Sequence, residues 1–296
     1  MIKRLLLLTP FLLLAACAGR RPEVRLTSEP SIERALDILG SVPQGRPLVK
    51  FLYKNPVRFE YSNTAGLCAK YAFKSNEILL PPAFRGSDRV LALAIARAAF
   101  IYRLRAETGL EEIISEEEEL AALYQARVAL EINLANADFS GEAKSAAGIK
   151  NDFCAYVLES SRYAMAQARK EVLTPDTDCQ RPLETLENQR VWLEKTRQAI
   201  NDENFYQLMY DRDLQRVKKG SMPYNEAMRN DAVLRGLPTY DVYRYQRTFY
   251  DRQSDLFSNF EKAYSRELKL DAAWRGEHQG AIDAAREEFS DCGLPE

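Results

Sequence analysis

The stretch Val90–Arg103, "VLALAIARAAFIYR", is the most apolar part of the chain after its first sixteen residues. Ser87 or Asp88 can cap a helix that carries this stretch, and Gly109 can end that helix. Two arginines interrupt the run, so it does not provide the ~20 apolar residues that a membrane span requires. The pattern therefore predicts a buried core helix over Val90–Leu104.

The beginning of the chain has the pattern of a secretory signal. Lys3 and Arg4 precede Leu5–Ala16, an uncharged run of twelve residues that ends in small side chains. Residues 14–17, "LAAC", resemble the lipobox of bacterial lipoproteins. The resemblance implies cleavage before Cys17, a diacylglycerol on its sulfur and an acyl chain such as palmitate on its new amino group. Several chains are needed because one acyl chain binds a membrane only marginally. The alternative is a plain secreted protein.

The residues after the lipobox favour a tether at the outer membrane. Residues 17–30 contain charges and prolines without periodicity. The lipoprotein sorting rule retains proteins with Asp after the lipidated cysteine at the inner membrane, so Ala18 favours the outer membrane, with the protein facing the periplasm. Removing the leader (residues 1–16) removes two positive charges from 41 Lys+Arg and leaves 43 Asp+Glu, a net charge of −4. Such a chain, without a contiguous basic run, offers no footprint for nucleic acid.

Four further cysteines would lie in an oxidising compartment. An even number of cysteines there favours disulfides, although three pairings remain open. The pair Cys154–Cys179 is weakly preferred because the two residues flank a predicted helix and a turn. The alternative is four buried free thiols. The spacing does not suggest a zinc site. The disulfide candidates are Cys68, Cys154, Cys179 and Cys292.

Residues 31–140 predict an α+β region. A short helix begins near Ile32, and the apolar period then changes to two over Leu48–Leu80, with turn-forming residues at each break. This pattern predicts a small, mostly antiparallel sheet of three or four strands. The strand segments are "LVKFLY" (48–53), "VRFEYS" (57–62), "CAKYAF" (68–73) and "EILLP" (77–81).

Residues 141–296 predict a long helical region, so the whole chain is predicted to be predominantly helical. Helices are expected near Asp152–Val172, Leu183–Lys218 and Tyr240–Arg275. The last helix carries aromatic side chains at seven-residue spacing, which favours core packing, although an aromatic groove for a glycan or peptide is the alternative. The stripe comprises Tyr243, Tyr250, Phe257 and Tyr264, with Phe260 and Leu268 beside it.

The order of sheet, apolar helix and acidic helix resembles the zincin metallopeptidases. In that family an edge strand precedes a helix with the motif His-Glu-x-x-His, and in the gluzincin branch a later helix supplies a third zinc ligand, a Glu. The segment "NEILLPPAFRGSDRVLALAIARAAFIYR" is similar to the strand, loop and helix of such domains, and "SEEEELAALYQARVALE" is similar to the third-ligand helix. The resemblance covers roughly Leu48–Leu134 and aligns the motif with Ala96 to Phe100. Glu117 or Glu118 stands nearest to the third ligand.

The metal-binding residues of that motif are absent. Ala96 and Phe100 replace the two histidines, and Arg97 replaces the catalytic glutamate. Alanine and phenylalanine cannot hold a divalent ion, and Arg97 would repel one. We therefore expect a degenerate zincin-like fold without metal, in which Arg97 turns towards Glu117 or Glu118.

Other catalytic patterns are also missing. The only histidine, His278, stands beside Glu277, where a surface position is expected. There is no nucleophile elbow, Walker loop or dinucleotide fingerprint, and thus no predicted small-molecule cofactor. The first hypothesis is a lipid-anchored, non-catalytic envelope protein that binds a protein or cell-wall partner. The alternative is a metal-free hydrolase of peptidoglycan that uses carboxylates such as Glu117 or Glu118; it requires two carboxylates in a cleft, one with a raised pKa.

Overall fold

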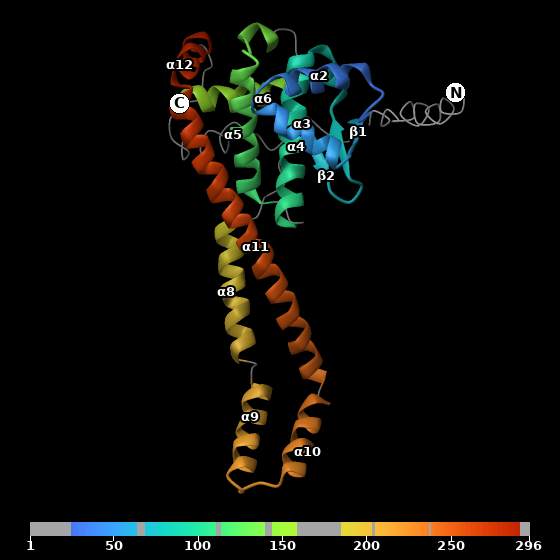
Figure 1. Cartoon of the computed structure of the whole chain (residues 1–296), viewed down its shortest axis with the longest axis vertical. Helices are drawn as coiled ribbons and strands as arrows, with labels where there is room; N and C mark the ends of the chain where they lie inside the picture. The colour runs from blue at the N-terminus through green and yellow to red at the C-terminus, as the bar shows by residue number, and fades with distance from the viewer. Residues whose placement is uncertain are drawn as a thin grey trace, which may run out of the picture.

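A long helical arm extends from the head of the protein (Figure 1). The computed structural model describes residues 25–63, 69–110, 114–139, 144–158, 185–202, 205–236 and 238–290. Its α+β fold is predominantly helical, as the sequence predicts, with a small sheet in the N-terminal part. The head comprises residues 25–158 and 257–290 within these ranges, and the arm comprises residues 185–256 within them.

The sheet of the head has three strands in the order β1-β3-β2. β1 (Arg58–Tyr61) pairs with β3 (Glu77–Leu80) in parallel, and β2 (Lys70–Ala72) pairs with β3 in antiparallel orientation. The prediction of a mostly antiparallel sheet is therefore wrong, and the sheet is mixed. β1 and β2 do not form a hairpin, because β3 lies between them and runs in the direction of β1.

A helix replaces the first predicted strand. α3 (Gly45–Lys54) contains the segment "LVKFLY". Leu48 and Leu52, one helical turn apart, are both fully buried. Pro47 lies in the first turn, where its missing N–H removes no intrahelical hydrogen bond. The strand prediction failed here because a short apolar run has no period of its own that separates a strand from a buried helix.

α4 (Asp88–Thr108) is the central helix of the head and contains the opening stretch of the sequence. The Ser87 hydroxyl accepts a hydrogen bond of 3.3 Å from the backbone N–H of Val90, which caps the helix. Gly109 ends it at φ +74°, a left-handed conformation that glycine adopts without strain. α4 packs against α2 (Pro30–Ser41), α3, the sheet and α5 (Ser115–Glu131), so both sides of the helix are apolar.

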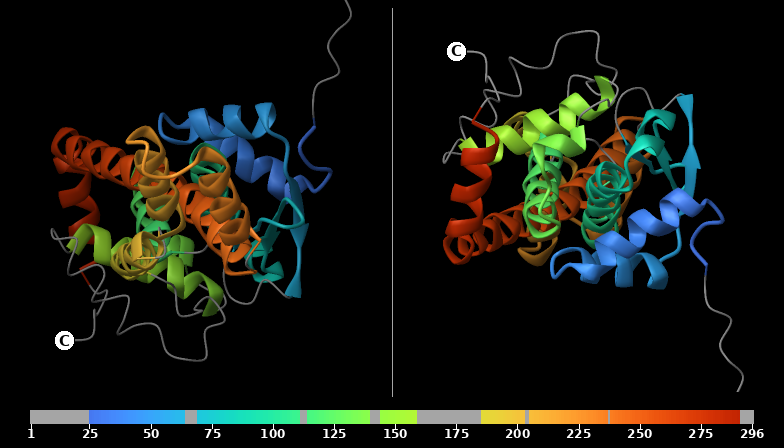
Figure 2. Two further views of the ribbon diagram at one scale, coloured as in Figure 1. Left: turned by 90° about the horizontal axis from the view of Figure 1, so that it is seen from below. Right: turned by 90° about the horizontal axis from the view of Figure 1, so that it is seen from above.

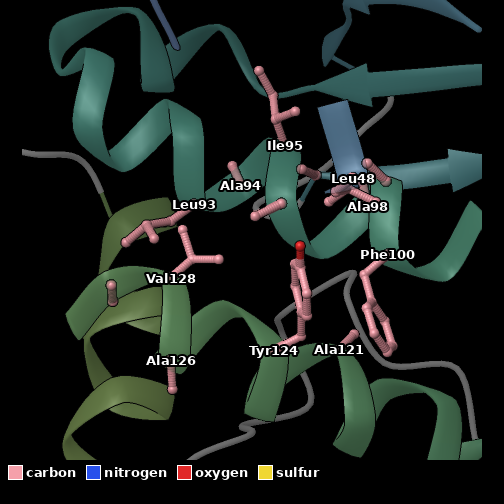
Figure 3. Packing of buried hydrophobic residues seen from close by; sticks show 14 of the residues in the cluster. Leu48, Leu93, Ala94, Ile95, Ala98, Phe100, Ala121, Tyr124, Ala126 and Val128 are labelled. Carbon is pink, nitrogen blue, oxygen red and sulfur yellow. The ribbon is translucent and has the colours of Figure 1, made fainter. Parts of the chain in front are cut away.

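The rest of the head covers the far side of α5. This part consists of α6 (Lys144–Leu158), the C-terminal half of α11 (Pro238–Glu277) and α12 (Gln279–Glu288). Two short 3₁₀ helices complete it, η3 (Pro82–Gly86) and η4 (Asn136–Phe139). One continuous apolar core extends from Ile32 to Phe289, and Figure 3 shows its centre between α4 and α5. The predicted domain boundary near residue 140 stays a prediction.

The arm is formed by helices that lead away from the head and return to it (Figure 1). α8 (Leu186–Asp202) and α9 (Phe205–Lys218) lead outwards, and α10 (Tyr224–Arg235) and the start of α11 (Pro238–Glu277) lead back. The predicted helix 183–218 is thus two helices, whereas α11 agrees with the predicted helix 240–275. Within the described ranges, no helix combines the length and apolarity that crossing a membrane requires.

The aromatic stripe of α11 joins the core at its C-terminal end. Phe257 and Phe260 are buried, and Tyr264 and Leu268 pack against the core as partly buried residues. This part of the stripe belongs to the core, which is the interpretation that the sequence favours over an aromatic groove. The side chain of Tyr243 lies outside the described residues, whereas Phe249 in the arm is 40% exposed.

Candidate functional site

Two of the positions aligned with the zincin motif, Ala96 and Phe100, lie at the centre of the head among apolar side chains. Ala96 and Phe100 on α4 are fully buried, as is Leu93. The ring of Phe100 stacks on Tyr124 of α5 with a centroid distance of 4.7 Å (Figure 3). The Tyr124 hydroxyl donates a hydrogen bond of 2.6 Å to the backbone oxygen of Gln44, which fixes the ring. The predicted inward orientation of this face is confirmed.

Arg97 points away from this apolar face and binds two carboxylates. Its Nη2 donates to Glu118 of α5 at 2.8 Å and its Nη1 to Asp152 of α6. The predicted ion pair with α5 is confirmed for Glu118. Burial lowers the pKa of Arg97, but the two carboxylates outweigh that effect, and the pKa is raised above its ordinary value. The guanidinium is therefore a permanent cation that links three helices.

Glu117 has a different partner. Its carboxylate accepts two hydrogen bonds of 2.6 Å from the Nε and Nη2 atoms of Arg105, which lies two turns after Arg97 on α4. Only 1% of the Glu117 side chain and 6% of that of Arg105 are exposed. Burial raises the pKa of Glu117 to about 7, against the opposing effect of Arg105. Both candidate carboxylates of the sequence are thus engaged by arginines.

A second buried cluster of charges joins α5 to α11. Nη1 of Arg127 lies 3.4 Å from Oδ1 of Asp271, which also accepts a hydrogen bond of 3.2 Å from the Tyr156 hydroxyl. Arg103 of α4 reaches Glu267 of α11 at 3.4 Å. Burial raises the pKa of Tyr156, and the neighbouring Asp271 adds to this effect. The cluster holds the C-terminal half of α11 against the head.

A solvent-facing hollow of about 420 Å³ lies where the arm meets the head. Glu116 in its wall accepts a hydrogen bond of 3.1 Å from the backbone N–H of Leu186, at the start of α8. Glu261 is bonded to Arg190 at 2.7 Å. Glu117, the carboxyl group with a pKa raised to about 7, does not line this hollow. A carboxylate hydrolase would need a carboxyl group of raised pKa inside a cleft that holds a second carboxylate. Here the carboxyl group of raised pKa and the hollow lie at different places in the structure.

The cysteine candidates lie mainly outside the described residues. Cys17, Cys68, Cys179 and Cys292 are not described. Cys154 is fully buried on α6, and the disulfide pairing stays a prediction. His278 is partly buried, and its ring stacks on Trp274 at 4.0 Å. The described residues contain no cluster of three or more His, Cys, Asp or Glu side chains suited to a metal ion.

The sequence interpretation missed three partners of the candidate residues, namely Arg105, Tyr124 and Asp152. One signal was available for Arg105: it follows Arg97 by eight residues and therefore lies on nearly the same face of α4, opposite the acidic start of α5. No such signal exists for Asp152, because its contact with Arg97 spans 55 residues and depends on the packing of α6.

The chain was compared with protein-family models, with curated proteins and with solved structures, and none of them matches it.

Proposed function

We propose that the protein is a lipid-anchored, non-catalytic component of the bacterial cell envelope whose arm binds a protein partner. The observation that carries the proposal is the exposure of large apolar side chains on the arm. Tyr224 is 59% exposed and Val233 63% exposed on α10, and Met228 of the same helix is also exposed. On α8 and α11, the exposed Trp192 and Phe249 contact each other edge to face at 6.1 Å.

The centre of the head supports a structural role for the zincin-like region. The apolar pair Phe100–Tyr124 and the ion pairs of Arg97 occupy the positions where a metallopeptidase would hold its metal. The carboxylates of the buried Glu117 and of the partly exposed Glu118 are bonded to arginines, which opposes their use as an acid and a base. These contacts favour the non-catalytic role over the alternative of a carboxylate hydrolase.

The lipid anchor and the arm together suggest how the protein works. A lipidated Cys17 would hold the head at the membrane, and α11, with 40 residues, spans ~60 Å at 1.5 Å per residue. The exposed residues of α10 lie at the end of the arm distant from the head (Figure 1). A partner bound there would be held at a distance from the anchor.

Site-specific photo-crosslinking in cells tests the proposal. A photoreactive amino acid placed at Tyr224 or Val233 should yield one defined protein adduct, and the same amino acid at Glu287, exposed on α12 of the head, should not yield it. Substituting Met228 with Glu should abolish the adduct, because a charge on an apolar contact surface opposes burial. Equal adducts from both regions, or none from the arm, would reject a binding arm.

A further inference from the structure

A basic and aromatic surface covers the outer side of α3 and the adjoining β2–β3 turn. On α3, Arg46, Lys50 and Lys54 follow each other at intervals of four residues and are exposed, with Tyr53 beside them at 48% exposure. The opposite side of the helix carries the buried Leu48 and Leu52. We call this surface the basic face; it comprises Arg46, Lys50, Tyr53 and Lys54 of α3 with Phe73 and Lys74 of the turn.

The turn is attached to the C-terminal end of α3 by specific contacts. Nδ2 of Asn76 donates a hydrogen bond of 3.3 Å to the backbone oxygen of Pro56, directly after the helix. Tyr102 of α4 contacts Phe51 of α3 at 5.1 Å and Tyr71 of β2 at 4.7 Å. These contacts hold the β2–β3 turn, which carries the exposed Phe73 and Lys74, against the C-terminal end of α3.

The charge of this region differs from that of the whole chain. Residues 38–59 and 61–76 contain six Lys and Arg and no Asp or Glu, although the complete chain has a net charge of −2. The two nearest carboxylates in sequence, Glu60 and Glu77, both pair with Arg58. Among the described residues, no carboxylate pairs with Lys50, Lys54 or Lys74, so their ammonium groups face solvent.

The helix α3, which carries most of the basic face, belongs to the layer of the head that lies beside the start of the described chain. Figure 2 shows the first described residues next to the α2–α3 layer and the sheet, on the side opposite to α12. Eight residues, 17–24, connect a lipidated Cys17 to Arg25, and they span at most ~28 Å when fully extended. An anchor with such a short tether brings this side of the head to the membrane.

We infer that the basic face docks on an anionic phospholipid surface and orients the head on the membrane. Lysine and arginine bind anionic headgroups electrostatically, and exposed aromatic side chains insert at the boundary between headgroups and acyl chains. Charge complementarity, the two exposed rings and the short tether all favour this partner. Only the orientation of the head on the membrane rests on the proposed lipid anchor. The basic face can bind anionic phospholipid without that anchor.

Vesicle binding by the chain from Ala18 to Glu296 tests the inference separately from lipidation. This form retains every described residue and the whole core, which begins at Ile32. It should bind phosphatidylglycerol vesicles and not phosphatidylcholine vesicles in sedimentation assays. Binding should weaken strongly from 0.05 to 0.3 M salt, because the electrostatic attraction is screened. Absence of a preference for phosphatidylglycerol would overturn the inference, while palmitate labelling of the complete chain reports on the anchor independently.

Matched charge variants test the location of the surface. The triple variant K50Q/K54Q/K74Q should bind phosphatidylglycerol vesicles about a hundredfold more weakly, since each basic residue near such a surface contributes about fivefold. The control K195Q/K218Q/K269Q changes the same charge at exposed positions of α8, α9 and α11 and should bind like the unmodified chain. Equal losses in the two triple variants would overturn the assignment to the basic face.

Two further outcomes identify other occupants. If inorganic phosphate displaces the chain from vesicles more effectively than chloride at equal ionic strength, the surface holds a discrete phosphate site rather than a membrane. If the chain dimerises without vesicles and the basic-face variant is monomeric, the surface is an interface between two copies. Either result would overturn membrane docking. In contrast, a moderate loss of vesicle binding by Y53A and F73A is expected if the two rings insert into the lipid.

Discussion

Arg105 of α4 and Glu117 of α5 form a bidentate ion pair, with both nitrogen–oxygen distances at 2.6 Å, in the buried contact between the two helices. The pair ties the C-terminal part of α4 to the first turn of α5. Because burial raises the pKa of Glu117 to about 7, from an ordinary value of 4.5, its contribution to stability depends on pH.

The Glu117 carboxyl group should make the free energy of unfolding fall as the pH rises. Between pH 4.5 and about 7 the folded protein retains a proton on Glu117 that the unfolded chain has lost. Its contribution is therefore fully present below pH 4.5 and is lost as the pH rises through about 7, at about 1.4 kcal/mol per unit of pKa shift. Urea unfolding of the wild type and of E117Q across this pH range measures the contribution of Glu117. The free energy of unfolding of the wild type, relative to that of E117Q, should decrease as the pH rises. A relative stability that increases with pH would contradict the shift.

Replacing Arg97 with Ala should destabilise the head by ~3 kcal/mol, because it leaves the carboxylates of Glu118 and Asp152 without their common cation. The control is R190A, which removes the more exposed pair with Glu261 and should cost at most ~1 kcal/mol. Chemical denaturation measures both changes. If R97A costs no more than R190A, the three-helix link formed by Arg97 contributes little.

Replacing Phe100 with Ala should cost ~3–5 kcal/mol, because the fully buried ring leaves a cavity against Tyr124. F249A truncates a ring that is 40% exposed on the arm and should cost less than ~1 kcal/mol. Thermal or urea unfolding checks the difference. Equal costs would mean that the motif position is not part of the packed core.

The purified protein should contain no stoichiometric zinc at the motif positions. The side chains of Ala96 and Phe100 carry no atom that can bind a metal, and Arg97, which stands between them in the sequence, is a cation. Elemental analysis after dialysis without chelator measures the zinc content. One zinc ion per chain that survives dialysis, and that the substitution R97A does not remove, would require ligands elsewhere in the chain.

Cys17 should carry lipid in cells. The wild type should incorporate labelled palmitate and sediment with membranes, while C17S should lose the label. The control C292S changes a cysteine distant from the lipobox and should keep both properties. Retention of the label by C17S would reject the lipoprotein interpretation.

The sequence predicts the elements of this fold better than their arrangement. The boundaries of α4 follow from a serine cap and a left-handed glycine, which are local signals. The sequence also predicts that Arg97 pairs with Glu117 or Glu118, because the acidic start of α5 is nearby in sequence. In contrast, the parallel pairing of β1 with β3 and the contact of Asp152 with Arg97 depend on segments distant in sequence, and no local pattern encodes them.

The misassigned α3 shows a second limit of sequence patterns. A strand and a buried helix present the same short apolar run, and the interval of four residues between Leu48 and Leu52 puts both on one face in either conformation. The same interval places Lys50 and Lys54 on one side of the element. An alternating strand would also place these two lysines together, but it would put Leu48 and Leu52 on their side. The basic face therefore depends on the helical conformation of this segment.

α11 belongs to both parts of the protein, because its first residues lie in the arm and Phe257, Phe260 and Asp271 lie in the core of the head. A single unbroken helix of this kind transmits mechanical load as a rigid lever. A force applied to the tip of the arm would reach the buried ion cluster around Arg127 as a torque. If the head is anchored as proposed, tension on a partner bound to the arm would thus reach the interior of the head.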